Sequence, residues 1–263
     1  MDEIVNSLLS TMNAQLPLMY SSMPGIQVVE ETDWLGMLSS HADVFYNAVY
    51  ESRFSQGNVG NRVDEVVSLF STRSQLPMVW FITPACRPKN LSEVLAGKGF
   101  KHAFKSPGMF LRLGEFHQKS NPESPHKIIQ VSTEEQLSQW IIPGRDGFSV
   151  SDSVIKAYFD LFKNKGFEPQ TPWKLFVGMV DNTPTTCARL FCANDAAGIY
   201  HVATVPSARG KGYGTEITTA ALEAAKNLGY QLAILASSPA GYHVYSRLGF
   251  RDCCHCDAYI GPQ

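Results

Sequence analysis

The chain has 263 residues, of which 44% are hydrophobic and 17% charged, with a formal net charge of −2. This length allows one large or two small domains, and the composition is that of a globular protein. The near-neutral charge gives no general attraction to nucleic acid or anionic lipid, and no apolar run approaches the roughly 20 residues of a membrane helix. The first four residues, Met1 to Ile4, are acidic where a signal peptide would be basic. We therefore expect a cytoplasmic protein with no nucleic-acid or membrane partner.

Six cysteines are present, but their spacing does not predict a disulfide framework. The run Cys253-Cys254-His255-Cys256 superficially resembles a metal site. Zinc needs four converging ligands, and neighbouring residues of a strand point to opposite faces of the sheet. No second Cys/His cluster completes the set, so we expect ordinary strand packing and no metal.

The first half of the chain, residues 1–115, shows the pattern of a small α/β unit. An apolar stripe at helical spacing predicts an amphipathic helix, and it is formed by Val63, Val66, Val67 and Phe70. Strands are expected at Met78–Ile82 and at Met109–Leu113, with a helix between them that ends near Gly99-Phe100.

Residues 116–126 are polar and contain two prolines, which predicts an interdomain linker. The second half, residues 127–263, then opens with a helix that begins after Thr133, where Thr133 and Gln136 form a capping box. A second helix is expected from about Ser153 to Asn164.

Three strands follow in the second half, at Trp173–Val180, Thr185–Asn194 and Ile199–Val205, the first two joined by a tight turn at residues 182–184. A helix is expected from Thr215 to Leu228, and a further strand at Leu232–Leu235. Each half thus ends with the same series: helix, strand, helix, Gly-Phe and strand. We interpret the chain as two copies of one α/β unit; chance similarity of short elements is the alternative.

A glycine-rich basic loop joins the third strand of the second half to its next helix. It reads Arg209-Gly210-Lys211-Gly212-Tyr213-Gly214-Thr215. Glycines let the backbone turn with its N–H groups facing inward, and the helix N-terminus adds unpaired donors, so the segment predicts a cradle for a pyrophosphate. The spacing matches neither the nucleotide P-loop nor the dinucleotide fingerprint.

The loop resembles the Q/R-x-x-G-x-G/A signature of the GCN5-related N-acetyltransferase (GNAT) superfamily. Tyr245-x-x-Leu248-Gly249-Phe250 is similar to the Tyr-x-x-Leu-Gly-Phe that closes the family's domain. The resemblance covers roughly residues 126–263. In the first half the loop counterpart, residues 57–62, lacks the signature, so we expect a degenerate module that binds no cofactor. The implied fold is α/β (α+β): two tandem GNAT-like modules, each a mixed, mostly antiparallel sheet flanked by helices.

The resemblance implies acetyl-CoA as co-substrate, held by two segments. The strand before the loop would bind the pantetheine arm and the acetyl carbonyl through its backbone, at Val202, Ala203, Thr204 and Val205. The diphosphate would be bound by Arg209, Gly210, Lys211, Gly212, Tyr213, Gly214 and Thr215. The sheet is expected to splay beside the third strand to admit the cofactor.

Tyr245 is the general acid that the resemblance implies, protonating the departing thiolate. A core tyrosine is the alternative, and Tyr242 on the same helix is a substitute candidate. Many family members have Asn seven residues and Ala four residues before this tyrosine, where this chain has Ser238 and Gly241. Ser238 is still a candidate pantetheine ligand, although this departure weakens the assignment.

A general base is harder to assign. His201 is the one imidazole on the third strand, where strict alternation would put Tyr200, Val202 and Thr204 on one face and His201 on the other. A structural histidine is the alternative, Asp195 and Glu216 are weaker candidates, and water alone could accept the proton.

The resemblance therefore implies a GNAT-type N-acetyltransferase that moves an acetyl group from acetyl-CoA to a primary amine by direct attack. A non-catalytic acetyl-CoA or acyl-CoA sensor is the alternative. The acceptor is a small-molecule amine or a peptide or protein amine, and neither it nor the oligomeric state is indicated.

Overall fold

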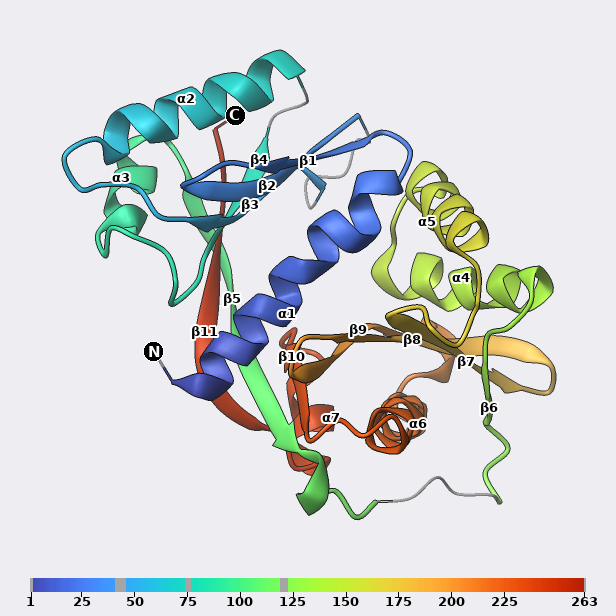
Figure 1. Ribbon diagram of the computed structural model, residues 1–263. Helices are drawn as coiled ribbons and strands as arrows, with labels where there is room; N and C mark the ends of the chain where they lie inside the picture. The colour runs from blue at the N-terminus through green and yellow to red at the C-terminus, as the bar shows by residue number, and fades with distance from the viewer. Residues whose placement is uncertain (1, 41–45, 74–76, 119–122, 263) are drawn as a thin grey trace. The chain divides into compact units, whose positions relative to one another are not determined.

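The computed structural model describes residues 2–40, 46–73, 77–118 and 123–262, and these group into two compact units (Figure 1). Unit 1 contains Met1–Gly108 together with Cys253–Gln263, and unit 2 contains Met109–Asp252. Neither unit is a continuous stretch of the first or second half of the chain. No helix among the described residues is long and apolar enough to cross a bilayer.

Unit 1 is built on a sheet with the order β1-β2-β3-β4-β11. Its strands are β1 (Ile26–Glu30), β2 (Trp34–Ser39), β3 (Ala48–Ser52), β4 (Met78–Ile82) and the end of β11 (Arg251–Gly261). All neighbours are antiparallel except β3 and β4. The unit also holds helices α1 (Glu3–Met19), α2 (Val59–Arg73) and α3 (Leu91–Gly97). The predicted apolar stripe of α2 is confirmed, because Val63, Val66 and Phe70 are buried against Trp80 and its neighbours.

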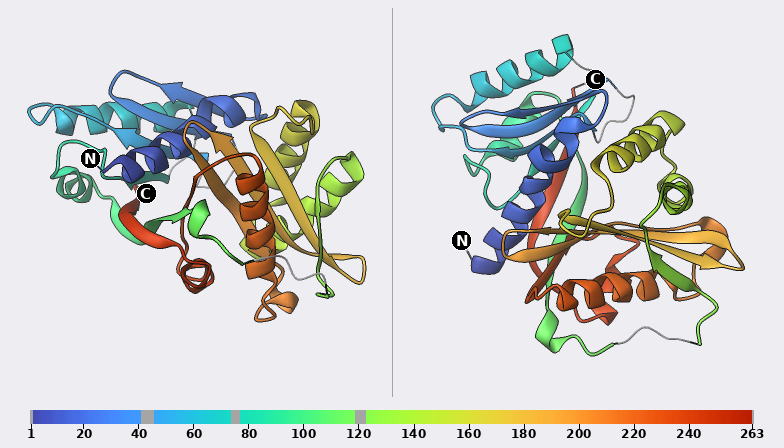
Figure 2. Two further views of the ribbon diagram at one scale, coloured as in Figure 1. Left: turned by 60° about the horizontal axis from the view of Figure 1, so that its bottom comes forward. Right: turned by 45° about the vertical axis from the view of Figure 1, so that its right-hand side comes forward.

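Unit 2 is built on a sheet with the order β5-β10-β9-β8-β7-β6. Its strands are the end of β5 (Lys101–Arg112), β6 (Lys127–Gln130), β7 (Trp173–Val180), β8 (Thr183–Ala193), β9 (Ala196–Thr204) and β10 (Leu232–Ala236). Helices α4 (Glu134–Phe148) and α5 (Asp152–Lys165) cover one face of β7–β9, and α6 (Tyr213–Asn227) covers the other (Figure 2). The short helix α7 (Tyr242–Arg247) precedes β11.

The repeat predicted from the sequence is present in the order of elements. The series α2, β4, α3, β5 in the first half corresponds to α6, β10, α7, β11 in the second. In each half, the strands before and after the long helix run parallel to each other. These strands are β3 and β4 in the first half, and β9 and β10 in the second. The helix that begins after Thr133 is also confirmed, since the Thr133 hydroxyl accepts from the Gln136 amide at 3.2 Å.

The last strand of each half contributes to the other unit. Residues 257–261 of β11 pair with β4 in unit 1, although they end the second half of the sequence. Met109, Leu111 and Leu113 end the first half, yet they lie in the hydrophobic core of unit 2. The predicted module boundaries, 1–115 and 127–263, describe the sequence repeat and remain a prediction. The compact units instead place residues 109–115 in unit 2 and residues 253–263 in unit 1. Both described ends of the predicted linker are anchored, because Phe116 and His126 are buried.

Candidate functional site

An opening in the sheet of unit 2 lies between β9 and β10. The two parallel strands pair only at Ala233 with Ala197 and at Ile234 with Gly198. Among the described residues no strand pairs with that side of β9 from Ile199 to Thr204, while its other edge stays bonded to β8. The sheet therefore splays between β9 and β10 beyond Gly198, as the sequence predicts.

A β-bulge lies on β9 beside this opening. The register to β8 shifts between Arg189–Tyr200 and Cys187–Ala203, so β9 has one extra residue there. His201 sits in the bulge with φ +55°, in the left-handed region. The bulge overturns the predicted alternation of side chains. Tyr200 pairs with Arg189, on the face covered by α4 and α5, and His201 packs there too, so two successive side chains share one face.

Beyond the bulge the backbone groups alternate in a way that fits the predicted pantetheine contacts. The Val205 amide donates to the Thr185 carbonyl of the β8 segment at 2.9 Å. Because alternate residues of an antiparallel strand bond to opposite sides, Ala203 also faces β8, and Val202 and Thr204 face the opening. Of the four predicted strand residues, Val202 and Thr204 thus present backbone groups to the opening, and Ala203 and Val205 hold the strand in place.

The glycine-rich loop forms a row of amides at the start of α6. Gly210 and Gly212 have φ of +76° and +87°, conformations that glycine adopts without strain. Among the described residues, the backbone amides of residues 210–214 donate no main-chain hydrogen bond. The next amide, of Thr215, is already bonded to the Gly212 carbonyl at 2.9 Å. Five successive N–H groups at a positive helix end make an anion-binding cradle.

The two basic side chains of the loop differ in their surroundings. Arg209 Nε donates to the Thr204 carbonyl at 3.2 Å, and its Nη2 donates to the Gly147 carbonyl of α4 at 3.1 Å. Arg209 therefore ties the loop to β9 and α4, a function that sequence spacing does not predict. Lys211 is exposed and its ammonium group has no ion pair among the described residues, so it can approach an anion directly.

A buried polar cluster holds the first turn of α6. The His126 Nδ1 lies 2.9 Å from Glu216 Oε2, and its Nε2 lies 2.8 Å from the Thr186 hydroxyl. Ser124 donates to both Glu216 oxygens at 3.0 and 2.9 Å, and Tyr213 stacks on the His126 ring at 4.5 Å. Burial lowers the pKa of His126, although Glu216 opposes this shift. Sequence reasoning missed this cluster, because its members are far apart along the chain.

Tyr245 lies on α7 in the core of unit 2, with 9% of its surface exposed. Burial raises its pKa to about 12, so the phenol stays protonated at neutral pH but is a weaker acid than an exposed tyrosine. A Cβ at Gly241 would meet Tyr245 Cε2 at 2.8 Å. Glycine at this position thus makes room for the Tyr245 ring, which gives the departure from the family pattern a structural reason.

The remaining candidates are also placed by the structure. Ser238 is exposed, and its hydroxyl accepts from the Gly241 amide at 3.2 Å. Tyr242 donates to Asp252 at 3.3 Å. Burial and the charge of Arg189 lower the pKa of His201 to about 3, so this imidazole cannot hold a proton at neutral pH and is a poor general base. Asp195 lies exposed in the β8–β9 turn, and Glu216 is held in the buried polar cluster.

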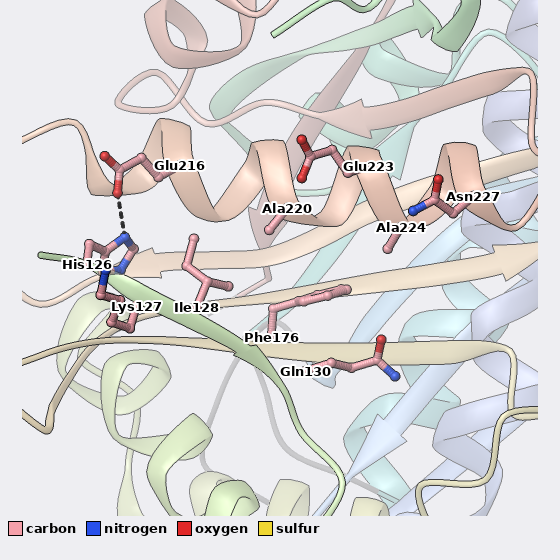
Figure 3. Close-up of a pocket in the computed structure, with 10 residues that line it drawn as sticks. All are labelled: His126, Lys127, Ile128, Gln130, Phe176, Glu216, Ala220, Glu223, Ala224 and Asn227. Carbon is pink, nitrogen blue, oxygen red and sulfur yellow. Dashed lines mark hydrogen bonds and ion pairs between the residues drawn. The ribbon is translucent and has the colours of Figure 1, made fainter. Parts of the chain in front are cut away.

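A groove of about 450 Å³ lies between α6 and the edge strand β6 (Figure 3). Ile128, Phe176 and Ala220 contribute apolar surface, and Glu216 and Glu223 contribute carboxylates. The groove shares Glu216 with the first turn of α6, but it does not include β9, β10 or the glycine-rich loop. The splayed edge of β9 and the loop amides therefore lie outside this groove.

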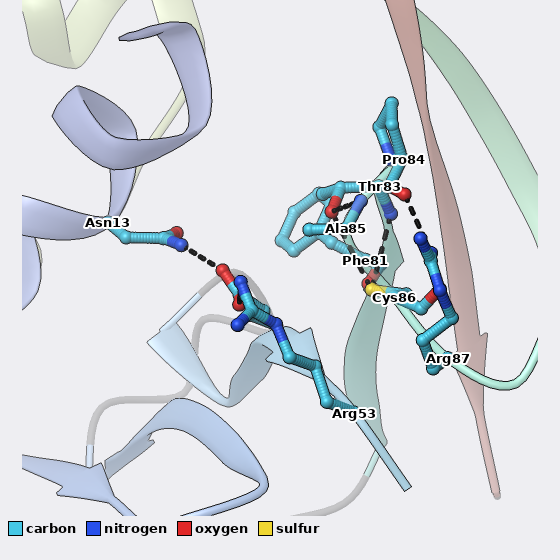
Figure 4. A network of polar contacts seen from close by, with 9 residues as sticks. Asn13, Arg53, Phe81, Thr83, Pro84, Ala85, Cys86 and Arg87 are labelled. Carbon is cyan, nitrogen blue, oxygen red and sulfur yellow. Dashed lines mark hydrogen bonds and ion pairs between the residues drawn. The ribbon is translucent and has the colours of Figure 1, made fainter. Parts of the chain in front are cut away.

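The equivalent opening in unit 1 is closed by main-chain hydrogen bonds. Beyond the paired residues of β3 and β4, Arg53 forms a parallel bridge with Arg87. The Arg87 amide donates to the Ser52 carbonyl at 2.9 Å, and the Phe54 amide donates to the Arg87 carbonyl at 3.1 Å. The turn that brings Arg87 there is held by its own contacts, including Arg87 Nη1 to the Pro84 carbonyl at 2.9 Å (Figure 4). This closure favours the prediction that the first module holds no cofactor.

The cysteines of the described chain are all free. Within residues 2–40, 46–73, 77–118 and 123–262, no group of three or more His, Cys, Asp or Glu side chains is arranged to hold a metal ion.

Comparison with known proteins shows what this arrangement is similar to. Residues 172–252 match the family described as acetyltransferase (GNAT) domain. A GCN5-related N-acetyltransferase from Kribbella flavida superposes with a TM-score of 0.76 at 16% identity, covering 100% of this chain and 97% of that one. A tandem GNAT protein from the clavulanic acid biosynthesis pathway gives 0.61 at 12% identity, covering 100% and 96%. A GCN5-related N-acetyltransferase from Sphaerobacter thermophilus also gives 0.61 at 12% identity, covering 87% and 80%.

No curated protein sequence matches the chain. The family match and the shared fold confirm the predicted resemblance to the GNAT superfamily and the predicted fold class. The whole-chain superposition on a tandem GNAT protein is consistent with the two-module form. The family match at residues 172–252 supports acyl transfer as the general activity.

Proposed function

We propose that this protein, with its GNAT domain sequence at residues 172–252 and a GNAT fold throughout, is an acetyl-CoA-dependent N-acetyltransferase. One observation carries the proposal. The unpaired edge of β9 leads directly to five successive amides that donate no main-chain hydrogen bond among the described residues, at the start of α6. An extended arm that ends in a diphosphate matches this sequence of groups: a strand edge for the arm and a helix N-terminus for the phosphates.

The residues of the site fit acetyl-CoA as follows. Val202 offers its backbone N–H and C=O groups to the pantetheine arm and the acetyl carbonyl, and Thr204 offers its N–H, since its carbonyl accepts from Arg209. The amides of residues 210–214 bind the diphosphate, assisted by the Lys211 ammonium group. Arg209 holds the loop in place through Thr204 and Gly147. Ala203, Val205 and Thr215 support this backbone, and Ser238 contributes at the start of α7.

Acetyl-CoA supplies the acetyl group as a thioester. The amine nitrogen of the acceptor bonds to the acetyl carbon as the carbon–sulfur bond breaks, and a backbone N–H of β9 stabilises the negative charge on the carbonyl oxygen. Tyr245 donates its hydroxyl proton to the sulfur. Its pKa of about 12 keeps this proton on the phenol until negative charge develops on sulfur. The surplus amine proton goes to water, since His201 is too weak a base, and Tyr245 regains a proton from water after the thiol forms.

The acceptor is a primary amine of a small molecule, peptide or protein, and we expect the reaction to take place in the cytoplasm. Calorimetric titration of acetyl-CoA into the full chain tests the proposal, with CoA release followed against a panel of amines. We expect one binding site per chain, because the opening in unit 1 is closed, and amine-dependent release of CoA.

The outcomes distinguish an enzyme from a sensor. Binding without release by any amine favours the acyl-CoA sensor. Absence of binding by the wild-type chain refutes the proposal.

A further inference from the structure

We infer that His201 is a positioning residue that holds the β9 bulge so that Val202 and Thr204 face the opening. This inference rests on the proposed function for its catalytic consequence, but its structural part can be tested without it. The aromatic partners of the His201 ring come from α4 and α5, and not from the glycine-rich loop or Tyr245.

The backbone conformation at His201 limits which residues fit there. Its φ of +55° lies in the left-handed region, which is unfavourable for most side chains and which Asn, Asp and His tolerate better. Strand residues do not adopt this conformation in regular pairing, so a stabilising environment is required to maintain it.

Three aromatic rings provide that environment. Trp140 stacks on the His201 ring with centroids 5.5 Å apart, Tyr158 lies at 4.6 Å, and Phe148 approaches edge-on at 5.4 Å. Trp140 is itself fixed, since its indole N–H donates to the Ala188 carbonyl of β8 at 3.0 Å. Side chains of α4 and α5 thus hold the His201 ring in place. A fixed ring also restricts the backbone of His201.

The bulge decides which amides reach a ligand. With the extra residue, Val205 and Ala203 bond toward β8, and Val202 and Thr204 point to the opening. Removing the bulge would shift the register by one residue and reverse these directions. The aromatic rings around His201 therefore set the direction of the backbone groups that the proposed reaction uses. These rings lie on the face of the sheet opposite to α6.

Amide hydrogen exchange on the ligand-free protein tests the structural part. In His201→Ala we expect the Val205 amide, bonded to Thr185, to exchange about tenfold faster relative to amides in β7. His201→Asn tolerates the left-handed conformation and should leave the Val205 amide within about threefold of wild type. Asn194→Ala is the matched control, because Asn194 has φ +54° in the β8–β9 turn and should not affect Val205.

Kinetics of acetyl transfer tests the catalytic part. We expect His201→Ala to lower kcat at least about tenfold and to weaken CoA binding by less than this, because the pantetheine contacts of Val202 and Thr204 are disturbed while the loop amides are untouched. His201→Asn should recover most of kcat, and Asn194→Ala should retain it.

Unchanged Val205 exchange in His201→Ala would overturn the inference, as would equal effects of His201→Ala and Asn194→Ala. If the wild-type chain fails to bind acetyl-CoA, the proposed function fails, and the exchange result still decides the role of His201.

Discussion

Placing a carboxylate in the amide cradle provides a quantitative test of the anion site. Gly212 has φ +87° at the start of α6, and a Cβ added there would meet no atom within 4 Å. Gly212→Glu and Gly212→Gln therefore share the same backbone strain and nearly the same volume, and they differ only in charge. The difference between these two variants isolates the electrostatic contribution.

The size of the effect follows from Coulomb's law. A carboxylate about 6 Å from a diphosphate of charge −2 is repelled by about 1.4 kcal/mol in water, and by about twice that at a lower effective dielectric constant. We thus expect Gly212→Glu to bind CoA about 10- to 100-fold more weakly than Gly212→Gln. Without CoA the Glu variant should be the more stable of the two, because a carboxylate at a helix N-terminus is stabilising by about 0.3–1 kcal/mol.

Calorimetry of CoA binding and thermal unfolding of both variants provide the measurements. Added salt should narrow the affinity gap, since the site is open to solvent. Equal CoA affinities for the Glu and Gln variants at low salt would refute the assignment of the loop as the diphosphate site.

Three further predictions concern the acid, its neighbour and the buried imidazole of β9. Tyr245→Phe should lower kcat about 100-fold at unchanged CoA affinity, because only the proton donor is lost; wild-type kcat should show no alkaline decline due to Tyr245 below about pH 10, given its pKa of about 12. Full activity in Tyr245→Phe would exclude it as the acid. Gly241→Ala should lower kcat about fivefold, because the new Cβ displaces the Tyr245 ring. The control is Gly60→Ala in α2, where a new Cβ meets no atom within 4 Å; it should stabilise the fold by about 0.5–1 kcal/mol and leave kcat unchanged. Equal kcat in both variants would contradict this. His201 has a folded pKa of about 3, below its unfolded value, so its contribution to stability is present above pH 6.5 and is lost as the pH falls toward 3. Between pH 7.5 and 5.0 the free energy of unfolding should fall by about 2 kcal/mol less in His201→Asn than in wild type, measured by urea denaturation. An unchanged pH dependence would show that folding does not lower the pKa of His201.

Local patterns in the sequence located the elements of unit 2 closely. Trp173–Val180 is a strand with the predicted bounds, and the strand–loop–helix around Arg209–Thr215 is present as expected. These features depend on glycine conformations, apolar periodicity and helix capping, all of which act over a few residues. For the same reason, the residues of the glycine-rich loop are sufficient by themselves to indicate an anion cradle.

Side-chain direction on β9 could not be predicted in the same way. Strict alternation put Tyr200 and His201 on opposite faces, but the bulge places both beneath α4 and α5. A bulge forms because the partner strand and the covering helices favour it, and the residues near His201 in the sequence do not predict it. The same holds for the cluster of Ser124, His126 and Glu216, whose members meet only after α6 packs on the sheet.

The sequence by itself determined that this chain carries a glycine-rich loop at a helix N-terminus in a repeated α/β unit, because these features arise from short-range backbone chemistry. Only the tertiary structure decided three further points: that β9 separates from β10, that the equivalent gap beside β3 is closed through Arg87, and that β11 completes the sheet of unit 1. Each depends on pairing between distant segments. Their register is fixed by the packing of whole faces, so it cannot be obtained from either segment alone.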